Sequence, residues 1–174
     1  HADLTDEYAA IPNECRAVAA VCGGEVLRDV SFETFLAKLP ECRKQCGDRA
    51  VLRAFHIYAD NERVAKQVAA LRADDFDTFL QLVNESGLSS WEYLQNVIPA
   101  GYKEHQEVAV TIAAAKHFLR GKGAVRVHGG GFAGTVQAFV PVEELAQFKE
   151  QMEAILGAGR CHVLSIRPEG GAVL

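Results

Sequence analysis

The sequence lacks the features that mark membrane-spanning and exported proteins. No apolar run approaches the ~20 residues that a membrane-spanning helix needs. The segment from His1 to Glu7 is polar and acidic, which is unlike a signal peptide. We therefore expect a cytoplasmic protein without a membrane partner.

Methionine is almost absent: Met152 is the only one among 174 residues. The first residue is His1 and not methionine. We therefore expect a piece of a longer product or a processed chain. The length suits one sizeable core, and a division in two would leave small halves. We expect a single domain over residues 1–174.

A surplus of basic charge is also missing. The chain has 18 basic and 23 acidic residues, a net charge of −5, and no basic face stands out. Nucleic acid is therefore a disfavoured partner. The hydrophobic content of 49% and the charged content of 24% are those of an ordinary globular protein.

No repeated C-x-x-C spacing accompanies the cysteines, which are odd in number. This pattern indicates neither a disulfide framework nor a zinc site, so we expect reduced thiols and no metal bound by them. Cys42 and Cys46 would share one helix face, but His56 is the only further candidate ligand nearby. The five cysteines are Cys15, Cys22, Cys42, Cys46 and Cys161.

Apolar residues at three- and four-residue spacing predict several amphipathic helices. The expected caps are Thr5 or Asp6 for the first helix, Ser31 for the second and Asp75 for a later one. The long central helix should bury a continuous stripe, and Phe76 should face inward after it. The expected helices span residues 5–21, 31–39, 48–73, 75–86, 102–119 and 141–156, and the stripe consists of Val51, Phe55, Tyr58, Val64, Val68 and Leu71.

Strand-like composition is confined to the last third of the chain. Residues 124–127, 135–140 and 161–166 are rich in β-branched and apolar residues. The predicted order of elements is a series of helices followed by two strands, a helix and a third strand. This order is typical of an α+β fold. We expect a small, mainly antiparallel sheet with helices packed on one face.

A glycine-rich loop joins the first two expected strands, with Gly129, Gly130 and Gly131 in succession and Gly134 shortly after. A bare hairpin needs only one or two residues at positive φ, so it does not explain three consecutive glycines. Successive amides without side chains can form a nest that binds an anion such as phosphate. A wide bulged turn packed under a helix would have the same composition.

Four landmarks in one order resemble the galactokinases, members of the GHMP small-molecule kinase family. Arg126-Val127-His128 and the glycine loop through Thr135 resemble the motif R-M-T-G-G-G-F-G-G-C. Three earlier stretches also resemble family motifs. Glu7-Tyr8 with Cys15 resembles E-Y-N-x-R-R-x-x-C, and His56 with Asn61-Glu62-Arg63-Val64 resembles H-x-x-x-E-N-x-R-V. Asn84-Glu85-Ser86 resembles N-E-S-H. The sugar-recognition signature, the ATP loop and the catalytic Asp of the family's N-terminal half do not occur here.

The resemblance therefore implies the C-terminal domain of a sugar kinase that phosphorylates galactose or a related sugar with ATP and Mg²⁺. The fragment itself should be inactive, because the N-terminal ATP-binding half and its catalytic residues are absent. The resemblance makes the glycines of the loop active-site residues: Gly129, Gly130, Gly131 and Gly134. It makes Tyr8 the residue whose hydroxyl reaches a sugar hydroxyl. From the sequence alone Tyr8 could equally be a packed helix residue.

Several positions depart from the family pattern. Ile11 stands where Arg is usual, Gly87 where His is usual and Ala133 where Gly is usual. A galactokinase-like sensor that binds sugar and nucleotide without turnover, and acts through a protein partner, is therefore an alternative. An α+β binding module with no kinase ancestry is a third possibility.

Other polar residues of the landmarks are expected to have structural roles. Phosphoryl transfer of this type needs no histidine, so His56 and His128 are expected to be structural. Asn84, Glu85 and Ser86 are expected to form a network near a helix end, and Phe132 to fill the core. The surface that would face the missing half should favour self-association or leave an apolar wall near Tyr8 and Gly131.

Overall fold

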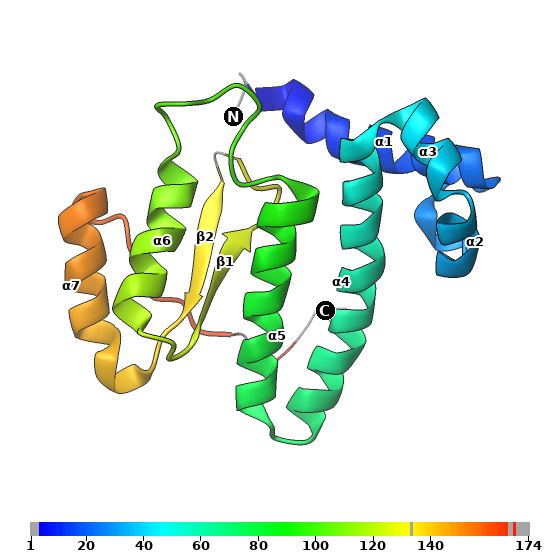
Figure 1. Cartoon of the computed structure of the whole chain (residues 1–174). Helices are drawn as coiled ribbons and strands as arrows, with labels where there is room; N and C mark the ends of the chain where they lie inside the picture. Colours follow the sequence, from blue (N-terminus) through cyan, green and yellow to red (C-terminus); the bar gives the residue numbers. More distant parts are fainter. Residues whose placement is uncertain (1–3, 133, 167–168, 170–174) are drawn as a thin grey trace.

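The computed structural model describes residues 4–132, 134–166 and 169 of the chain, and it is mainly helical (Figure 1). Its helices are α1 (Thr5–Cys22), α2 (Phe32–Ala37), α3 (Leu39–Cys46), α4 (Asp48–Arg72), α5 (Phe76–Ser89), α6 (Glu107–Leu119) and α7 (Leu145–Leu156). Short turns complete the list: η2 (Leu27–Asp29) and η4 (Val142–Glu144) are 3-10 turns, and η3 (Ser90–Leu94) is a π-helical turn. None of the described helices is both long enough and apolar enough to span a membrane.

Two antiparallel strands form the sheet, β1 (Ala124–His128) and β2 (Thr135–Phe139), and Ala124 pairs with Phe139 at one end. Figure 1 shows the sheet between α6 and α5, with α7 beyond α6 and α4 beyond α5. The first three helices lie across the upper end of α4. The predicted class, α+β with a small antiparallel sheet and packed helices, is confirmed.

Local sequence signals fix several helix ends as predicted. The hydroxyl of Ser31 accepts the amide of Thr34 at 3.1 Å, and the carboxylate of Asp75 accepts the amide of Thr78 at 3.0 Å. Gly23 ends α1 in the left-handed conformation, which glycine adopts without steric cost. The predicted cap of α1 is wrong, because Leu4 takes that position and makes no side-chain cap bond.

Other predicted boundaries also need correction. The second predicted helix stops at Ala37, and Pro40 lies in the first turn of α3, where its missing N–H costs nothing. Helix α6 begins at Glu107 instead of Tyr102. Residues 161–166 were predicted to be a strand, but they have no strand pairing among the described residues, and Val163, Leu164 and Ile166 are exposed.

The first of two hydrophobic clusters lies where α1, α2 and α3 meet the N-terminal half of α4. Phe35 and Val18 are completely buried in it, and Phe35 stacks on Tyr58 with ring centroids 5.4 Å apart. The hydroxyl of Tyr58 donates to the carbonyl of Val30 at 2.9 Å, so the aromatic ring is buried without loss of its polar contact. This cluster holds α1 in a fixed place on α4.

The second cluster joins α6 and α7 to the sheet. Val125 and Val127 of β1 pack with Ile112 of α6 and Met152 of α7, all nearly inaccessible to solvent. Alternate residues of β1 point into this cluster, as the pleat requires. It fixes the orientation of the hairpin and of the glycine loop at its tip.

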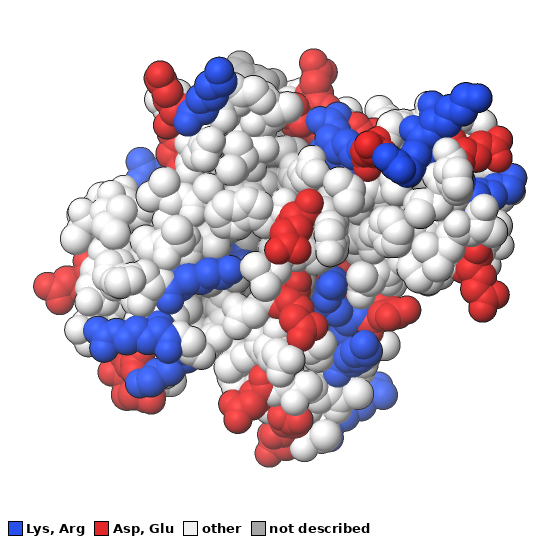
Figure 2. Space-filling view, viewed as in Figure 1, with Lys and Arg blue, Asp and Glu red and all other residues white. Residues whose placement is uncertain are grey.

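The predicted stripe on α4 is buried only in its first half. Val64, Val68 and Leu71 are 55%, 41% and 52% exposed, and Phe76 is 51% exposed. The stripe is apolar along its whole length. The second half of α4 extends away from the helices of the first cluster, and α5 is the described helix that packs beside it (Figure 1). These exposed apolar residues lie at the opposite end of α4 from Tyr8. On the face shown in Figure 2, acidic and basic side chains are interspersed.

A buried guanidinium ties α1 to α4. Arg53 is fully buried, and it donates to the carboxylate of Glu14 at 2.8 Å and to the carbonyl of Leu94 at 3.1 Å. Glu14 also accepts from Arg49 at 2.5 Å. Arg53 therefore connects α1, α4 and the π-helical turn through one charge.

Replacement of Glu14 should be strongly destabilising, because it leaves the charge of Arg53 buried without a partner. We expect Glu14→Gln to lower the free energy of unfolding by roughly 3 kcal/mol, measured by urea denaturation. The matched control is Asp48→Asn, which breaks the exposed pair with Arg43 and should cost less than about 1 kcal/mol. Equal effects of the two substitutions would contradict this role of Arg53.

Candidate functional site

The glycine loop spans residues 129–134 between the paired ends of β1 and β2. Gly129 and Gly131 have φ of +71° and +86°, and Phe132 has φ of +53°, which is unusual for a residue with a side chain. The amide of Gly134 donates to the carbonyl of Gly131 at 2.8 Å. The loop is therefore a folded unit with left-handed positions that a simple two-residue turn would not require.

Tyr8 lies against this loop although 123 residues separate it from Gly131. Its hydroxyl donates to the carbonyl of Gly131 at 3.0 Å, and its ring meets Phe132 edge-on at 5.3 Å. A Cβ on Gly130 would lie 2.7 Å from the Tyr8 ring, so only glycine fits there. The structure thus brings together the predicted sugar-binding residue and the predicted phosphate loop.

The other side of the loop rests on Asn96. The amide of Phe132 donates to the backbone carbonyl of Asn96 at 2.5 Å, and Nδ2 of Asn96 lies 3.5 Å from the carbonyl of Gly130. A side chain on Gly131 would collide with the carbonyl of Asn96. Phe132 is 3% exposed, which confirms the prediction that it fills the core.

The loop keeps exposed amides despite these contacts. Gly129 and Gly130 are exposed, and within the described residues no hydrogen bond occupies the amides of Gly129, Gly130 or Gly131. Successive amides of this kind suit an anion. The Gly134 amide is already bonded within the loop, and Ala133 lies outside the described residues.

Three of the landmark segments meet in one polar network between α4, α5 and β1. Arg126 of β1 donates to Oγ of Ser86 at 2.5 Å, and that hydroxyl donates to the carboxylate of Asp60 at 2.6 Å. Asp60 also accepts from Arg63 at 3.1 Å. These residues hold the sheet against the helices, so their role in this structure is to position the loop.

His56 is a buried member of the same network. Its Nδ1 lies 2.9 Å from the hydroxyl of Ser89, and Nε2 lies 3.8 Å from Asp60. Burial lowers the pKa of His56, and the Asp60 carboxylate only partly opposes that effect. His56 therefore has the structural place that the sequence predicted, whereas His128 is exposed at the end of β1.

Asn84 and Gly87 bring α5 close to β1. The side chain of Asn84 donates to the carbonyl of Gly123 at 3.2 Å and accepts the amide of Val125 at 3.1 Å. A Cβ on Gly87 would lie 2.8 Å from Cβ of Arg126. Of the residues predicted to form a network, Asn84 and Ser86 hold β1 against α5, whereas Glu85 accepts from Gln81 of the same helix. All three lie within α5, which continues to Ser89.

The cysteines form no metal site in the described part of the chain. All five are free thiols, and no three side chains of the metal-binding types converge there. The sulfur atoms of Cys22 and Cys42 lie 3.7 Å apart, and burial is the main cause that raises the pKa of Cys42 to about 11. A thiol with such a pKa is a poor nucleophile at neutral pH.

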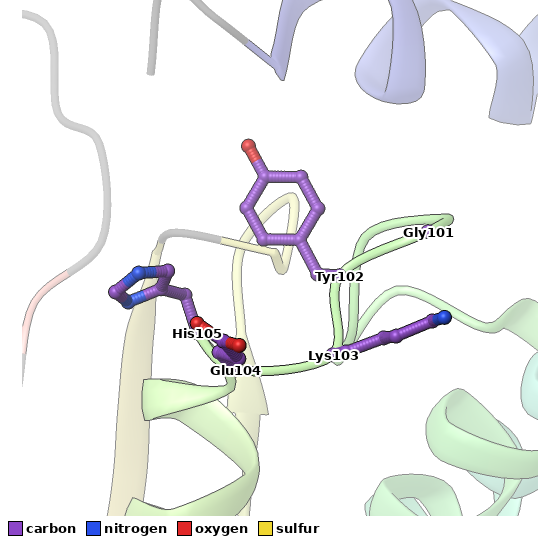
Figure 3. Close-up of a pocket in the computed structure, with 5 residues that line it drawn as sticks. All are labelled: Gly101, Tyr102, Lys103, Glu104 and His105. Atoms are coloured by element: carbon purple, nitrogen blue, oxygen red, sulfur yellow. The ribbon is translucent and has the colours of Figure 1, made fainter.

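A shallow hollow of about 300 Å³ lies in the loop before α6, lined by Gly101, Tyr102, Lys103, Glu104 and His105 (Figure 3). Figure 3 shows the side chains of Tyr102, Lys103 and His105 diverging from the ribbon. They share no focus at which a ligand could be held. The candidate site is therefore the face formed by Tyr8 and the glycine loop.

Comparison with known proteins agrees with this geometry. No family model matches the chain. The chain is 31% identical over 150 residues to a galactokinase of Glaesserella parasuis serovar 5, and 32% identical over 149 residues to one of Actinobacillus pleuropneumoniae. Both alignments cover 86% of the chain.

The chain is related to the galactokinases. It spans 37% of the length of the two relatives named above, which fits the prediction of a C-terminal portion. A crystal structure of Lactococcus lactis galactokinase in complex with galactose superposes with a TM-score of 0.66 at 22% identity. That superposition covers 87% of this chain and 38% of the galactokinase chain, and it shows that the two share a fold.

Sequence reasoning missed Asn96 in this site. Asn96 is not part of the four galactokinase landmarks, and nothing in its neighbours Gln95 and Val97 suggests a contact with the glycine loop. The available signal was indirect: three glycines in succession imply that another backbone comes close. The structure identifies that backbone as the segment at Asn96.

The lowered pKa of His56 predicts a pH-dependent stability. Between its lowered pKa and the ordinary value of 6.5, protons bind the unfolded chain in preference to the folded one, so stability falls as the pH drops below about 6.5. We expect His56→Gln to flatten the dependence of the free energy of unfolding on pH in this window. Denaturation at a series of pH values measures it, with the exposed His128→Gln as control. An unchanged slope in His56→Gln would refute the assignment.

Proposed function

We propose that this chain is the C-terminal domain of a galactokinase-like sugar kinase. The full-length protein would transfer the γ-phosphoryl group of ATP to a hydroxyl of galactose or a related sugar, with Mg²⁺. The N-terminal half would supply the ATP-binding loop and the catalytic residues. This domain alone would be inactive.

The observation that supports this function best is the contact between Tyr8 and Gly131. A residue matched to sugar binding and a loop matched to phosphate handling come from opposite ends of the chain and share a hydrogen bond of 3.0 Å. A phenol offers both a hydrogen-bond donor and an acceptor, which suits recognition of a sugar hydroxyl. Sugar and phosphate would thus meet at one face.

The loop fits the triphosphate end of ATP. The amides of the exposed Gly129 and Gly130 would face phosphate oxygens, and the absence of side chains permits close approach of the main chain. ATP supplies the phosphoryl group, and the amides of this loop would neutralise part of the charge that develops on it. Mg²⁺ would be bound mostly by the other half, as the galactokinase resemblance implies.

A non-catalytic sensor is the second candidate, supported by Gly87. The close approach of α5 to Arg126 leaves no space at residue 87 for the histidine that is usual in galactokinases. A chain that has lost such a group could retain ligand binding and act through a protein partner. The sequence of the N-terminal half would distinguish the sensor from the kinase, because loss of the catalytic Asp there would favour the sensor.

We also propose that the full-length protein is cytoplasmic and binds neither nucleic acid nor membrane. The isolated domain would self-associate through the surface that the other half normally covers. A second surface on α4, formed by the exposed apolar residues Val64, Val68 and Leu71, would also favour association. Their position on α4 differs from the expected wall near Tyr8.

The direct test is phosphoryl transfer by the full-length protein. We expect radiolabelled phosphate to move from ATP to galactose or another member of a hexose panel when Mg²⁺ is present. The 174-residue chain should transfer none. Normal nucleotide binding by the full-length protein without transfer to any hexose would refute the kinase and favour the sensor.

Tyr8→Phe tests the predicted sugar contact in the full-length protein. The variant keeps the edge-on contact with Phe132 but loses the hydroxyl, so we expect the apparent KM for the sugar to rise about tenfold. The control is Tyr102→Phe, in an exposed loop residue that should leave the KM unchanged. An unchanged sugar KM in Tyr8→Phe would exclude this role for the hydroxyl.

A further inference from the structure

Asn96 carries a buried side-chain oxygen without a hydrogen-bond partner, which its packing role does not explain. The residue is 3% exposed, and its Oδ1 has no hydrogen-bond partner in the described structure. A buried carbonyl left without a donor destabilises a folded protein by about 1–3 kcal/mol. Such groups are rare and each needs an explanation; within the described residues the other one is Nη2 of Arg53.

The position of Asn96 under the loop suggests that the residue supports the conformation of the loop. Its backbone carbonyl accepts the amide of Phe132, and its Nδ2 lies 3.5 Å from the carbonyl of Gly130. Since Gly131 has no side chain, the loop rests directly on it. Asn96 thus lies against Gly130, Gly131 and Phe132, directly beneath the exposed Gly129 and Gly130 of the loop.

The chain places Asn96 there with a specific backbone conformation. The π-helical turn η3 ends at Leu94, and Gln95 then takes the left-handed conformation with φ of +56°. Arg53 holds the carbonyl of Leu94, and Arg126 reaches the hydroxyl of Ser90 at 3.4 Å. Both ends of the turn are therefore fixed by guanidinium groups, and Asn96 has a rigid support.

We propose that Asn96 is a positioning residue that holds the glycine loop in its anion-binding shape, at a cost in stability. The proposal rests on the proposed function for the identity of the anion, the phosphate chain of ATP. It does not require Asn96 to touch the ligand. A side chain that merely filled space would stabilise the folded protein. The side chain of Asn96 should instead destabilise the folded protein and still be needed for the conformation of the glycine loop.

The test compares Asn96→Ala and Asn96→Asp in the full-length protein. Alanine removes the side-chain amide but keeps the backbone carbonyl that binds Phe132. Aspartate keeps the shape but places an oxygen against the carbonyl of Gly130. Asn13→Ala, at an exposed position of α1, is the matched control.

Three readouts separate positioning from simple packing. For Asn96→Ala we expect an unchanged or higher Tm, hydrogen exchange about fivefold to tenfold faster in residues 129–132, and an apparent KM for ATP higher by a similar factor. The KM for sugar should change less. Aspartate should not restore the ATP KM.

The outcomes also separate this inference from the proposed function. If the unmodified protein phosphorylates no sugar, the proposed kinase function is wrong. Hydrogen exchange in residues 129–132 and the affinity for ATP would still test the role of Asn96. A large fall in Tm for Asn96→Ala, with exchange and ATP affinity of the folded protein unchanged, would show a packing residue. Behaviour equal to that of Asn13→Ala would also overturn the proposal.

Discussion

The position of the site depends on two guanidinium groups that join elements far apart in the sequence. Arg53 links α1 to α4 and to the turn before Asn96, while Arg126 links β1 to α5 and, through Ser86 and Asp60, to α4. Carboxylate and carbonyl oxygens replace part of the solvation that the buried Arg53 loses, and hydroxyl and carbonyl oxygens accept from the half-buried Arg126. As a result, α4 is the common support for both walls of the site.

This arrangement gives the galactokinase landmarks a physical meaning. The histidine and arginine of one landmark, the serine of another and the arginine before the glycine loop form one network between helix and sheet. In this structure they hold the loop in place, and none of them lies beside Tyr8. Under the proposed function, chemistry at the site would therefore be left to the glycine amides, to Tyr8 and to groups outside the chain. The relatives' similarity extends over both the support and the loop.

The sequence predicted well what depends on local interactions. The hairpin, the caps at Ser31 and Asp75 and the end of α1 at Gly23 follow from hydrogen bonds and backbone preferences within a few residues. Prediction failed where tertiary packing decides. Val64, Val68 and Leu71 have the spacing of a buried face, yet no described element covers that face. Residues 161–166 have strand composition, but in the described structure they pair with neither β1 nor β2.

The site itself was predictable in part. Glycine composition and family resemblance led to the loop and to Tyr8, and the structure brings them together. Asn96 could not be found in this way, because its contact with the loop arises mainly from a main-chain carbonyl, which no side-chain pattern encodes. The same holds for Gly87, whose importance appears only when Arg126 is seen against it.

The hydrogen bond between Tyr8 and Gly131 also has a consequence for how the molecule folds. The two hydrophobic clusters are built largely from neighbouring segments, whereas this bond closes a separation of 123 residues. Contacts between distant parts of a chain form slowly, because the intervening segment must first give up its freedom. The face formed by Tyr8 and the glycine loop would therefore be completed only when the first helix docks on the β1–β2 hairpin, so partly folded chains would lack the proposed binding surface.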